Sequence, residues 1–309
     1  MLTLASPHQM PDQTGRTIVV TGANSGIGRA AAASLAARGA RVILAVRDRD
    51  RGHAAAATMD GEVEVRRLDL ASLTSIRDFA SDIDGAVDVL INNAGTMTDA
   101  LRHTADGFEL QFGINHLGHF ALTNLLLDRV TNRIVTVSSA AHRSARIDFD
   151  DLQWERRTYH PFRAYGQSKL ANLLFTTELQ RRLAAVGSPV IATSAHPGWA
   201  ATGFRIASGN GLLDALAAVS APLLAQGPEG GSLPTLLAAV GDVPGGSFIG
   251  PSRLGGVRGP AAVTEPSPGA RDADVAGRLW EVSERLTDTR FPLTSRSVAS
   301  DQATDDPEA

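Results

Sequence analysis

The strongest constraint on this 309-residue chain is a repeated alternation of short apolar runs with segments of helical periodicity. Runs such as Thr17–Thr21 and Arg41–Ala45 are rich in β-branched residues and almost continuously apolar, which is typical of strands buried on both faces of a parallel sheet. Right-handed helical crossovers between parallel strands place helices on both sides of the sheet. The pattern therefore predicts an α/β fold: a single doubly wound parallel sheet of about seven strands with helices on both faces.

The predicted elements alternate along most of the chain. Strands are expected at Thr17–Thr21, Arg41–Ala45, Glu62–Leu68, Val87–Ile91, Arg133–Val137, Pro189–Ser194 and Ser247–Ile249. Helices are expected at Gly26–Ala37, Arg49–Met59, Leu73–Ile83, Phe108–Leu127, Ala164–Arg182, Gly230–Val240 and Asp272–Leu286. The Gly- and Pro-rich stretch Pro251–Gly269 is interpreted as a surface excursion before the last helix.

No linker divides the chain, so one large domain is expected over residues 15–294. It follows an N-terminal extension (1–14), contains a substrate lid near residues 203–226, and precedes an acidic tail (295–309) that is predicted to be disordered.

Composition excludes several classes of function. The net charge is −4 and no block of Lys and Arg stands out, so nucleic acid is not an expected partner. The chain has no cysteine, which excludes disulfides, thiolate catalysis and cysteine-ligated metals. No apolar run is long enough for a transmembrane helix and the first residues lack an apolar signal core, so a cytoplasmic location is expected.

A glycine-rich turn lies where the first strand becomes the first helix, at Thr21-Gly-Ala-Asn-Ser-Gly-Ile-Gly28. Gly22 permits a tight turn, Gly26 lets backbone amides approach a pyrophosphate, and Gly28 allows close contact between helix and strand. The helix N-terminus adds partial positive charge. The turn predicts a dinucleotide site that includes Asn24, Ser25 and Ile27.

The end of the second strand predicts which dinucleotide binds. NAD sites usually carry a carboxylate about 20 residues after the turn, where it holds the ribose 2′-hydroxyl. Val46 occupies that position here, and Arg47 follows it. Because a guanidinium can pair with a 2′-phosphate, NADP is predicted in preference to NAD. Asp48 is close enough to weaken the argument, so NAD stays an alternative.

Tyr165 and Lys169 form a pair four residues apart on a predicted helix. Residues at this spacing lie on the same helix face, with their Cβ atoms roughly 6 Å apart. A cation beside a phenol favours the ionised form and is expected to lower the pKa of Tyr165 from about 10. The pair is therefore a candidate for acid–base catalysis near neutral pH.

Taken together, the motifs resemble the short-chain dehydrogenase/reductase family, which implies a Rossmann fold. Residues 15–286 carry the resemblance, through Thr21–Gly28, Asn92-Asn-Ala-Gly95, Ser138-Ser139, Tyr165–Lys169 and His196-Pro-Gly198. Finer strings such as Ile114-Asn-His-Leu-Gly-His119 are similar to the branch of retinol dehydrogenases, protochlorophyllide reductases and WW-domain oxidoreductases. Membrane-bound members of that branch often have an apolar N-terminal anchor, which is not expected here.

The resemblance implies roles for individual residues. Tyr165 would be the general acid or base, Lys169 would contact the nicotinamide ribose, and Ser139 would hold the substrate oxygen. Asn115 would bind a water that relays protons to Lys169. The implied cofactor contacts beyond the glycine turn and Arg47 are Asp69, Leu70, Asn92, Ala94, Gly95, Tyr165, Lys169, Pro197, Gly198 and Thr202.

The histidines are not interpreted as a metal site. His116 and His119 are three residues apart on a helix, but no carboxylate or cysteine completes a ligand set nearby, so we expect them to pack or hydrogen-bond locally.

Two segments are expected to shape the substrate side. Residues 204–226 contain an apolar helical pattern, which suits a mobile cover over a hydrophobic substrate, a packed amphipathic helix or a subunit contact. The charged and aromatic segment Arg143–Arg163 either borders the pocket or shields a helix that relatives use in oligomers.

The leading hypothesis is an NADP-dependent enzyme that interconverts a carbonyl and an alcohol on a small apolar molecule. Reduction of a carbon–carbon double bond is an alternative, because the same Tyr/Lys pair can donate that proton. A non-catalytic NADP sensor or interaction protein is a third hypothesis, since a fold alone does not imply an activity. Family members commonly form dimers or tetramers, so a homo-oligomer is also considered.

Overall fold

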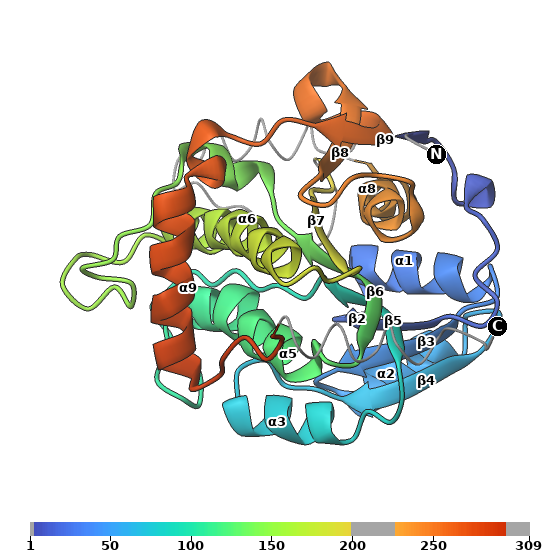
Figure 1. Ribbon diagram of the computed structural model, residues 1–309, viewed down its shortest axis with the longest axis horizontal. Coiled ribbons are helices and arrows are strands. Elements are labelled where there is room, and N and C mark those ends of the chain that lie inside the picture. Colours follow the sequence, from blue (N-terminus) through green and yellow to red (C-terminus); the bar gives the residue numbers. More distant parts are fainter. Residues whose placement is uncertain (1–2, 199–225, 295–309) are drawn as a thin grey trace, which may run out of the picture.

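A computed structural model describes residues 3–198 and 226–294 (Figure 1). Its centre is a nine-stranded sheet of order β1-β9-β8-β7-β6-β5-β2-β3-β4. The strands are β1 (Thr3–Leu4), β2 (Thr17–Thr21), β3 (Arg41–Val46), β4 (Val63–Arg67), β5 (Val87–Asn92), β6 (Val130–Val137), β7 (Ile191–Ala195), β8 (Phe248–Arg253) and β9 (Arg258–Thr264). All neighbouring pairs from β4 across to β8 are parallel. The predicted doubly wound parallel sheet is therefore confirmed.

Helices cover both faces of the sheet (Figure 1). They are α1 (Gly26–Ala36), α2 (Arg49–Ala56), α3 (Leu73–Ser81), α4 (Leu110–Phe112), α5 (Gly118–Leu126), α6 (Pro161–Ala185), α8 (Pro228–Val240) and α9 (Ala273–Thr287). One apolar core joins the sheet to α1 and α8, and a second joins its other face to α3, α5 and the end of α6. Burial of these apolar faces is the main stabilising term of the fold.

Two antiparallel strands extend the sheet beyond the predicted set. β9 pairs with β8 from Phe248↔Thr264 to Arg253↔Arg258, and β1 pairs with β9. The interpretation of Pro251–Gly269 as a surface excursion was therefore wrong over residues 251–264, which contain the end of β8, a short turn and β9. Its glycines and prolines suggested a loop, but both residue types are tolerated near the edge of a sheet. The two-residue strand β1 pairs only with Ala261 and Ala262 of β9, and α8 packs against the same strand.

The long helix predicted at Phe108–Leu127 is interrupted by a π-helical segment, Gly113–Leu117. α4 precedes it and α5 follows it. Single π-turns inside helices are uncommon and often occur at functional sites. Periodicity does not reveal one extra residue in a turn, because the apolar face continues on either side. The interruption carries Asn115, one of the predicted catalytic residues.

The carboxyl ends of β2 and β5 mark the switch point of the sheet. From β2 the chain winds outward through β3 and β4, and it then returns to β5 on the other side. In doubly wound sheets, ligands bind in the crevice at this point. The glycine turn after β2 and the Asn-Asn-Ala-Gly run after β5 therefore meet there.

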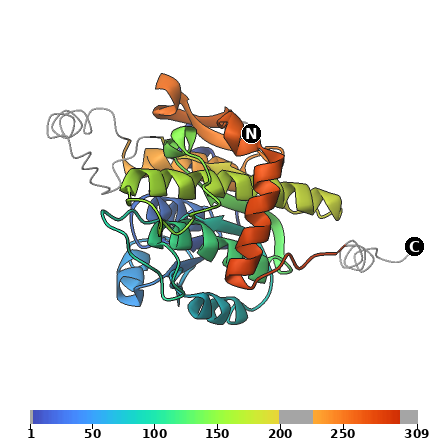
Figure 2. The ribbon, with the colours of Figure 1, turned by 90° about the vertical axis from the view of Figure 1, so that its left-hand side faces the viewer.

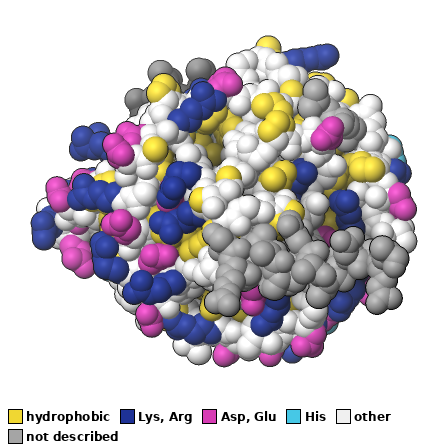
Figure 3. Space-filling model, in the orientation of Figure 1, with side chains coloured by type: hydrophobic (Ala, Val, Ile, Leu, Met, Phe, Trp, Pro, Cys, Tyr) yellow, Lys and Arg dark blue, Asp and Glu magenta, His cyan; other side chains and the backbone are white. Residues whose placement is uncertain are grey.

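The outer layer on the α6 side is formed by α9, which lies across α5 and α6 (Figure 2). Leu279 and Ala276 of α9 are buried in an apolar cluster with Leu170, Leu173 and Leu174. Across the face in Figure 3, acidic and basic side chains are interspersed among apolar ones. Among helices of the described residues, none combines the length and apolarity that a membrane crossing requires.

Candidate active site

The glycine turn between β2 and α1 depends on glycine at three positions. Gly22 and Gly26 have φ of 66° and 56°, in the left-handed region that favours glycine. A Cβ on Gly22 would lie 3.0 Å from Cα of Ala94, and one on Gly28 would lie 2.3 Å from Nδ2 of Asn93. The turn is therefore pressed against the loop that follows β5, and larger residues would separate the two.

The first turn of α1 keeps its backbone N–H groups free of a side-chain cap. Ser25 occupies the N-cap, but its hydroxyl makes no capping hydrogen bond. In α2, α3 and α9, by contrast, the N-cap side chain accepts a backbone N–H. Asn24 and Ile27 are half-buried beside these donors. Uncapped N–H groups at a helix N-terminus suit an anion, so the turn fits the pyrophosphate of a dinucleotide.

The hydroxyl of Thr21 joins the two loops. It accepts the backbone N–H groups of Asn93 and Ala94, each at 2.9 Å. The side chain of Asn93 donates to the carbonyl oxygen of Thr21 at 2.8 Å. The side chain of Asn92 instead turns into the protein and donates to Thr123 of α5 at 2.8 Å. Asn93 was not among the predicted cofactor-binding residues. Its side chain nevertheless is the one that contacts the end of β2 and the glycine turn.

The end of β3 presents Arg47 to solvent, while Asp48 is already engaged. Asp48 caps α2 by accepting the backbone N–H of Arg51 at 3.1 Å. After β4, the Asp69 carboxylate accepts the N–H of Ala71 at 3.0 Å. Leu70 is buried beside α5. These loops all leave the same edge of the sheet as the glycine turn.

Ser138 and Ser139 point in different directions at the end of β6. The Ser138 hydroxyl is buried and donates to the carbonyl oxygen of Lys169 at 2.7 Å. Ser139 is half-exposed, caps the 3₁₀ turn Ala140–Ser144, and hydrogen-bonds to Tyr165. The choice of Ser139 over Ser138 thus agrees with the placement of the two hydroxyls.

Gly166 allows the 3₁₀ turn that follows Ser139 (Ala140–Ser144, here called the serine turn) to approach α6. A Cβ there would lie 3.1 Å from the carbonyl oxygen of Ala141 and 3.3 Å from Cβ of Ala145. A larger side chain would push the turn, and with it Ser139, away from Tyr165. The sequence analysis used only Tyr165 and Lys169 of the Tyr-Gly-Gln-Ser-Lys string. Gly166, inside that string, was the residue that could have indicated this close approach.

Tyr165 and Lys169 lie on one face of α6, with Nζ 5.6 Å from the centroid of the phenol ring. Burial raises the pKa of Tyr165 to about 12, while the hydrogen bond with Ser139 acts in the opposite direction. Burial also lowers the pKa of Lys169 to about 8. The predicted lowering of the phenol pKa was therefore wrong for the protein alone. Desolvation outweighs the influence of an ammonium that is itself buried and donates to the Val137 carbonyl at 3.2 Å.

The side chain of Asn115 is fully engaged. Its Oδ1 accepts the N–H of Thr96 at 2.7 Å, and its Nδ2 donates to the Thr96 carbonyl at 3.0 Å and to Ser168 Oγ at 2.9 Å. A Cβ on Gly95 would lie 3.3 Å from Lys169 Nζ and 3.5 Å from Asn115 Oδ1. Asn115, Lys169 and the loop after β5 therefore converge, with both the oxygen and the nitrogen of the Asn115 side chain bonded to protein groups.

The segment after β7 begins the nicotinamide side of the predicted site. Gly198 has φ of 69°, and a Cβ there would lie 2.3 Å from the Val257 carbonyl oxygen. Pro197 precedes it in the same loop. Thr202 and residues 203–225 of the predicted lid lie outside the described residues.

The two helix histidines point to different neighbours. His116 Nε2 lies 2.8 Å from Ser283 Oγ of α9, whereas His119 Nε2 lies 2.9 Å from Thr21 Oγ1. Burial lowers the pKa of His116 to about 3 and that of His119 to about 4, so both rings are neutral. Within residues 3–198 and 226–294, no three His, Asp or Glu side chains are grouped as metal ligands.

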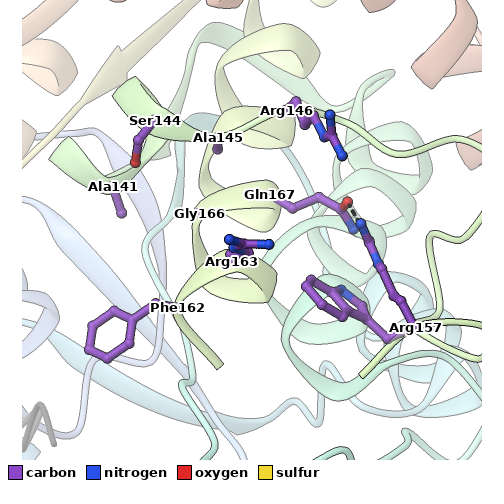
Figure 4. A pocket seen from close by; sticks show the side chains of 10 residues that line it. Ala141, Ser144, Ala145, Arg146, Arg157, Phe162, Arg163, Gly166 and Gln167 are labelled. Atoms are coloured by element: carbon purple, nitrogen blue, oxygen red, sulfur yellow. Dashed lines mark hydrogen bonds between the residues drawn. The ribbon is translucent and has the colours of Figure 1, made fainter. Parts of the chain in front are cut away.

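A recess of about 490 Å³ flanks α6 beside the serine turn (Figure 4). The segment Arg143–Arg163 borders this recess through Arg146, Trp154 and Arg157. The same segment is anchored to the start of α4, because the Tyr159 hydroxyl donates to the buried Glu109 at 2.9 Å. The segment is therefore packed against the helix that carries Asn115.

Known proteins share this architecture. The sequence matches the short chain dehydrogenase family over residues 16–211. It is 45% identical to retinol dehydrogenase 13 of Homo sapiens over 297 residues, covering 90% of this chain and 86% of that protein. A crystal structure of an uncharacterised protein from Mycobacterium paratuberculosis has a TM-score of 0.83 at 51% identity, covering 94% of this chain and 100% of the other. An NADP complex of Pseudomonas aeruginosa RhlG has a TM-score of 0.60 at 27% identity, covering 77% and 94%.

A doubly wound sheet with an uncapped glycine turn at its switch point is the architecture of dinucleotide-binding proteins. The chain belongs to the short-chain dehydrogenase/reductase family, in its retinol dehydrogenase-like branch. It is accordingly an NAD(P)-dependent oxidoreductase that acts on a small molecule, and the resemblance drawn from its motifs is confirmed.

Proposed function

We propose that the protein is an NADP-dependent reductase of aldehydes or ketones on small apolar molecules, with Tyr165 as the general acid. One observation carries the proposal: the Tyr165 side chain is hydrogen-bonded to Ser139 and its ring centroid lies 5.6 Å from Lys169 Nζ, at the sheet edge that holds the uncapped glycine turn. A carbonyl oxygen bound between the two hydroxyls would receive a hydrogen bond from each. When bound, the cofactor supplies the hydride.

The protonation states favour reduction. With a pKa raised to about 12, Tyr165 holds its proton at neutral pH and can give it to the substrate oxygen. Lys169, with a pKa lowered to about 8, can pass a proton toward the phenolate within the working pH range. Asn115 would hold the relay water through its backbone carbonyl, whose oxygen has a second lone pair beside the one that faces His119, while both amide hydrogens of its side chain are bonded to Thr96 and Ser168. General acid catalysis of this kind contributes about 10²–10⁴-fold to the rate.

The preference for NADP rests on the end of β3. Arg47 is exposed next to the position where an acidic residue would hold a ribose hydroxyl. Asp48, which could have taken that role, caps α2 instead. Asp69 and Leu70 would border the adenine, Asn92 to Gly95 the ribose, and Pro197, Gly198 and Thr202 the nicotinamide. Quaternary state and a cytoplasmic location stay predictions.

The relatives suggest the first substrate to assay. Several curated relatives are named retinol dehydrogenases, and the carbonyl partner of retinol is the polyene aldehyde retinal. An apolar aldehyde of this kind agrees with the apolar pattern of residues 204–226 in the sequence. We therefore propose long apolar aldehydes as the substrate class.

The test compares two tyrosine variants, since the chain contains only two tyrosines. NADPH oxidation is followed with retinal, straight-chain aldehydes and ketones. Tyr165→Phe is expected to lower kcat by about 10²–10⁴-fold and to leave the Kd for NADPH near that of the wild type. Tyr159→Phe, which loses the contacts with Glu109 and Gln111 but leaves Tyr165 and Ser139 in place, is the matched control and should keep its kcat. A Tyr165→Phe enzyme with the wild-type rate would remove the assignment.

A further inference from the structure

His119 is a buried residue that the proposed chemistry does not use, yet it connects two parts of the site. Its Nδ1 lies 3.1 Å from the backbone carbonyl oxygen of Asn115, one helical turn earlier. Its Nε2 lies 2.9 Å from the hydroxyl of Thr21, at the end of β2. The ring therefore spans from the π-helical segment to the strand that leads into the glycine turn.

The hydrogen-bond roles follow from the partners. A carbonyl oxygen only accepts, so Nδ1 of His119 carries the proton and donates it to Asn115. Burial, followed by the nearby charge of Lys169, keeps the pKa of His119 low, so the ring is neutral and its Nε2 is an acceptor. Thr21 then donates its single hydroxyl proton to Nε2, in preference to the Ile91 carbonyl oxygen at 3.4 Å.

The hydroxyl of Thr21 is left with every bonding position in use. It donates once, to His119, and its two lone pairs accept the N–H groups of Asn93 and Ala94. Those two residues belong to the loop on which the glycine turn rests. The chain of bonds thus runs from the cofactor loops through Thr21 and His119 to the carbonyl of Asn115.

We infer that His119 is a positioning residue that couples the cofactor loops to the Asn115 carbonyl. Asn115 lies in the π-helical segment, where the backbone departs from the regular α-helix, and the bond from Nδ1 gives its carbonyl oxygen support from a side chain. His119 supplies that support and transmits the position of the cofactor loops to it. This inference rests on the proposed function, in which the same carbonyl holds the relay water.

The chain itself suggests a variant that separates the two contacts. In α5, Asn124 donates from Nδ2 to the carbonyl oxygen of Phe120, four residues earlier, at 2.9 Å. An asparagine at position 119 can make the same bond to Asn115 but is too short for Thr21. His119→Asn therefore removes the Thr21 contact alone, and His119→Leu removes both. His116→Leu is the matched control, because His116 is equally buried one turn away, in the π-helical segment, but faces Ser283.

The experiment measures the Kd for NADPH by fluorescence, kcat with an aldehyde, and the melting temperature of each variant. His119→Leu and His119→Asn are both expected to raise the Kd by about tenfold, the equivalent of one lost buried hydrogen bond. His119→Leu should also lower kcat by about 10–100-fold through misplacement of the relay, and His119→Asn should recover most of that loss. His116→Leu should lower the melting temperature without changing the Kd.

A double variant tests the coupling directly. If His119 acts on the cofactor loops through Thr21, then Thr21→Val with His119→Leu binds NADPH no more weakly than Thr21→Val alone. The inference is overturned if His119→Leu keeps wild-type Kd and kcat, or if His116→Leu raises the Kd as much as His119→Leu. It is also overturned if the effects in the double variant simply add. A wild-type protein that does not bind NADPH would overturn the proposed function as well.

Discussion

The glycine turn after β2 (Gly22–Gly28) and the turn of α6 that carries Tyr165 and Lys169 lie at the same edge of the sheet but differ in the kind of residues they contain. The turn between β2 and α1 uses glycines and uncapped backbone N–H groups, with no ionisable side chain from Gly22 to Gly28. The turn of α6 holds a half-buried phenol and a buried ammonium whose pKa values are displaced in opposite directions. The glycine turn depends on close steric fit between backbone segments. The turn of α6 instead keeps a charged ammonium away from water, which lowers the stability of the folded protein.

The difference predicts that changes in the two turns have opposite effects on stability. Filling a glycine position should destabilise the protein, because the added atoms have no room. Removing the buried ammonium should stabilise it while abolishing activity. Four experiments test the contrast, beginning with the largest expected effect.

Lys169→Met should lower kcat by about 10²–10⁴-fold, because the relay and the charge beneath Tyr165 are both lost. It should also raise the free energy of unfolding at pH 7 by about 1–3 kcal/mol, because the wild type buries an ammonium whose pKa is lowered to about 8. Between pH 8 and 10.5 the unfolded state holds more protons at this lysine than the folded state, so wild-type stability recovers as the pH rises. The stability gap between variant and wild type should therefore shrink over that window in urea titrations.

Gly28→Ala should lower the free energy of unfolding by about 1–3 kcal/mol and weaken NADPH binding, because the new Cβ meets Asn93 at 2.3 Å. Gly277→Ala in α9 is the control, since nothing lies within 4 Å of a Cβ there. That change should stabilise the protein by about 0.5–1 kcal/mol through helix propensity. Equal effects of the two changes on thermal unfolding would contradict the steric account of the turn.

Acidification should unfold the protein through its buried histidines. Burial lowers the pKa of His119 and His196 from 6.5 to about 4, so the unfolded state binds more protons between these values. Stability is then fully present above pH 6.5 and falls with decreasing pH, by about 1.4 kcal/mol per pH unit for each histidine. Replacing His196 by Gln should make the plot of unfolding free energy against pH less steep; an unchanged slope would contradict the prediction.

Arg47→Leu should raise the Kd for NADPH by about tenfold and leave that for NADH nearly unchanged, because only NADPH carries a 2′-phosphate. Arg49→Leu is the matched control, since Arg49 is exposed in the same run but begins α2. Equal losses in the two variants would indicate a general effect of positive charge rather than recognition of the phosphate.

Local patterns were enough to predict most of the fold. Short apolar, β-branched runs that alternate with helical segments define the parallel strands. The glycines of the turn after β2 are required by the backbone conformation and by the close approach of the loop after β5. β9 was missed because Arg258–Thr264 includes Gly and Pro and becomes a strand only beside β8. The π-helical segment was missed because one extra residue in a turn leaves the apolar face nearly unchanged.

The candidate site likewise contains features that the local sequence predicts and features that depend on distant segments. Spacing along the helix brought Tyr165 and Lys169 to one face, and the order of the motifs brought Ser139 and Asn115 to the same edge. The outward turn of Ser139, the inward turn of Asn92 and the role of Asn93 depend on neighbours from other elements.

The amino-acid order alone determined which elements form, how they alternate and which chemical groups reach the carboxyl edge of the sheet, since these depend on interactions within about one turn or one strand. Only the tertiary structure decided the pKa of each group, the partners of His119 and the break in the helix of Asn115. Desolvation and hydrogen-bond pairing are properties of the surroundings that the folded chain builds from distant segments.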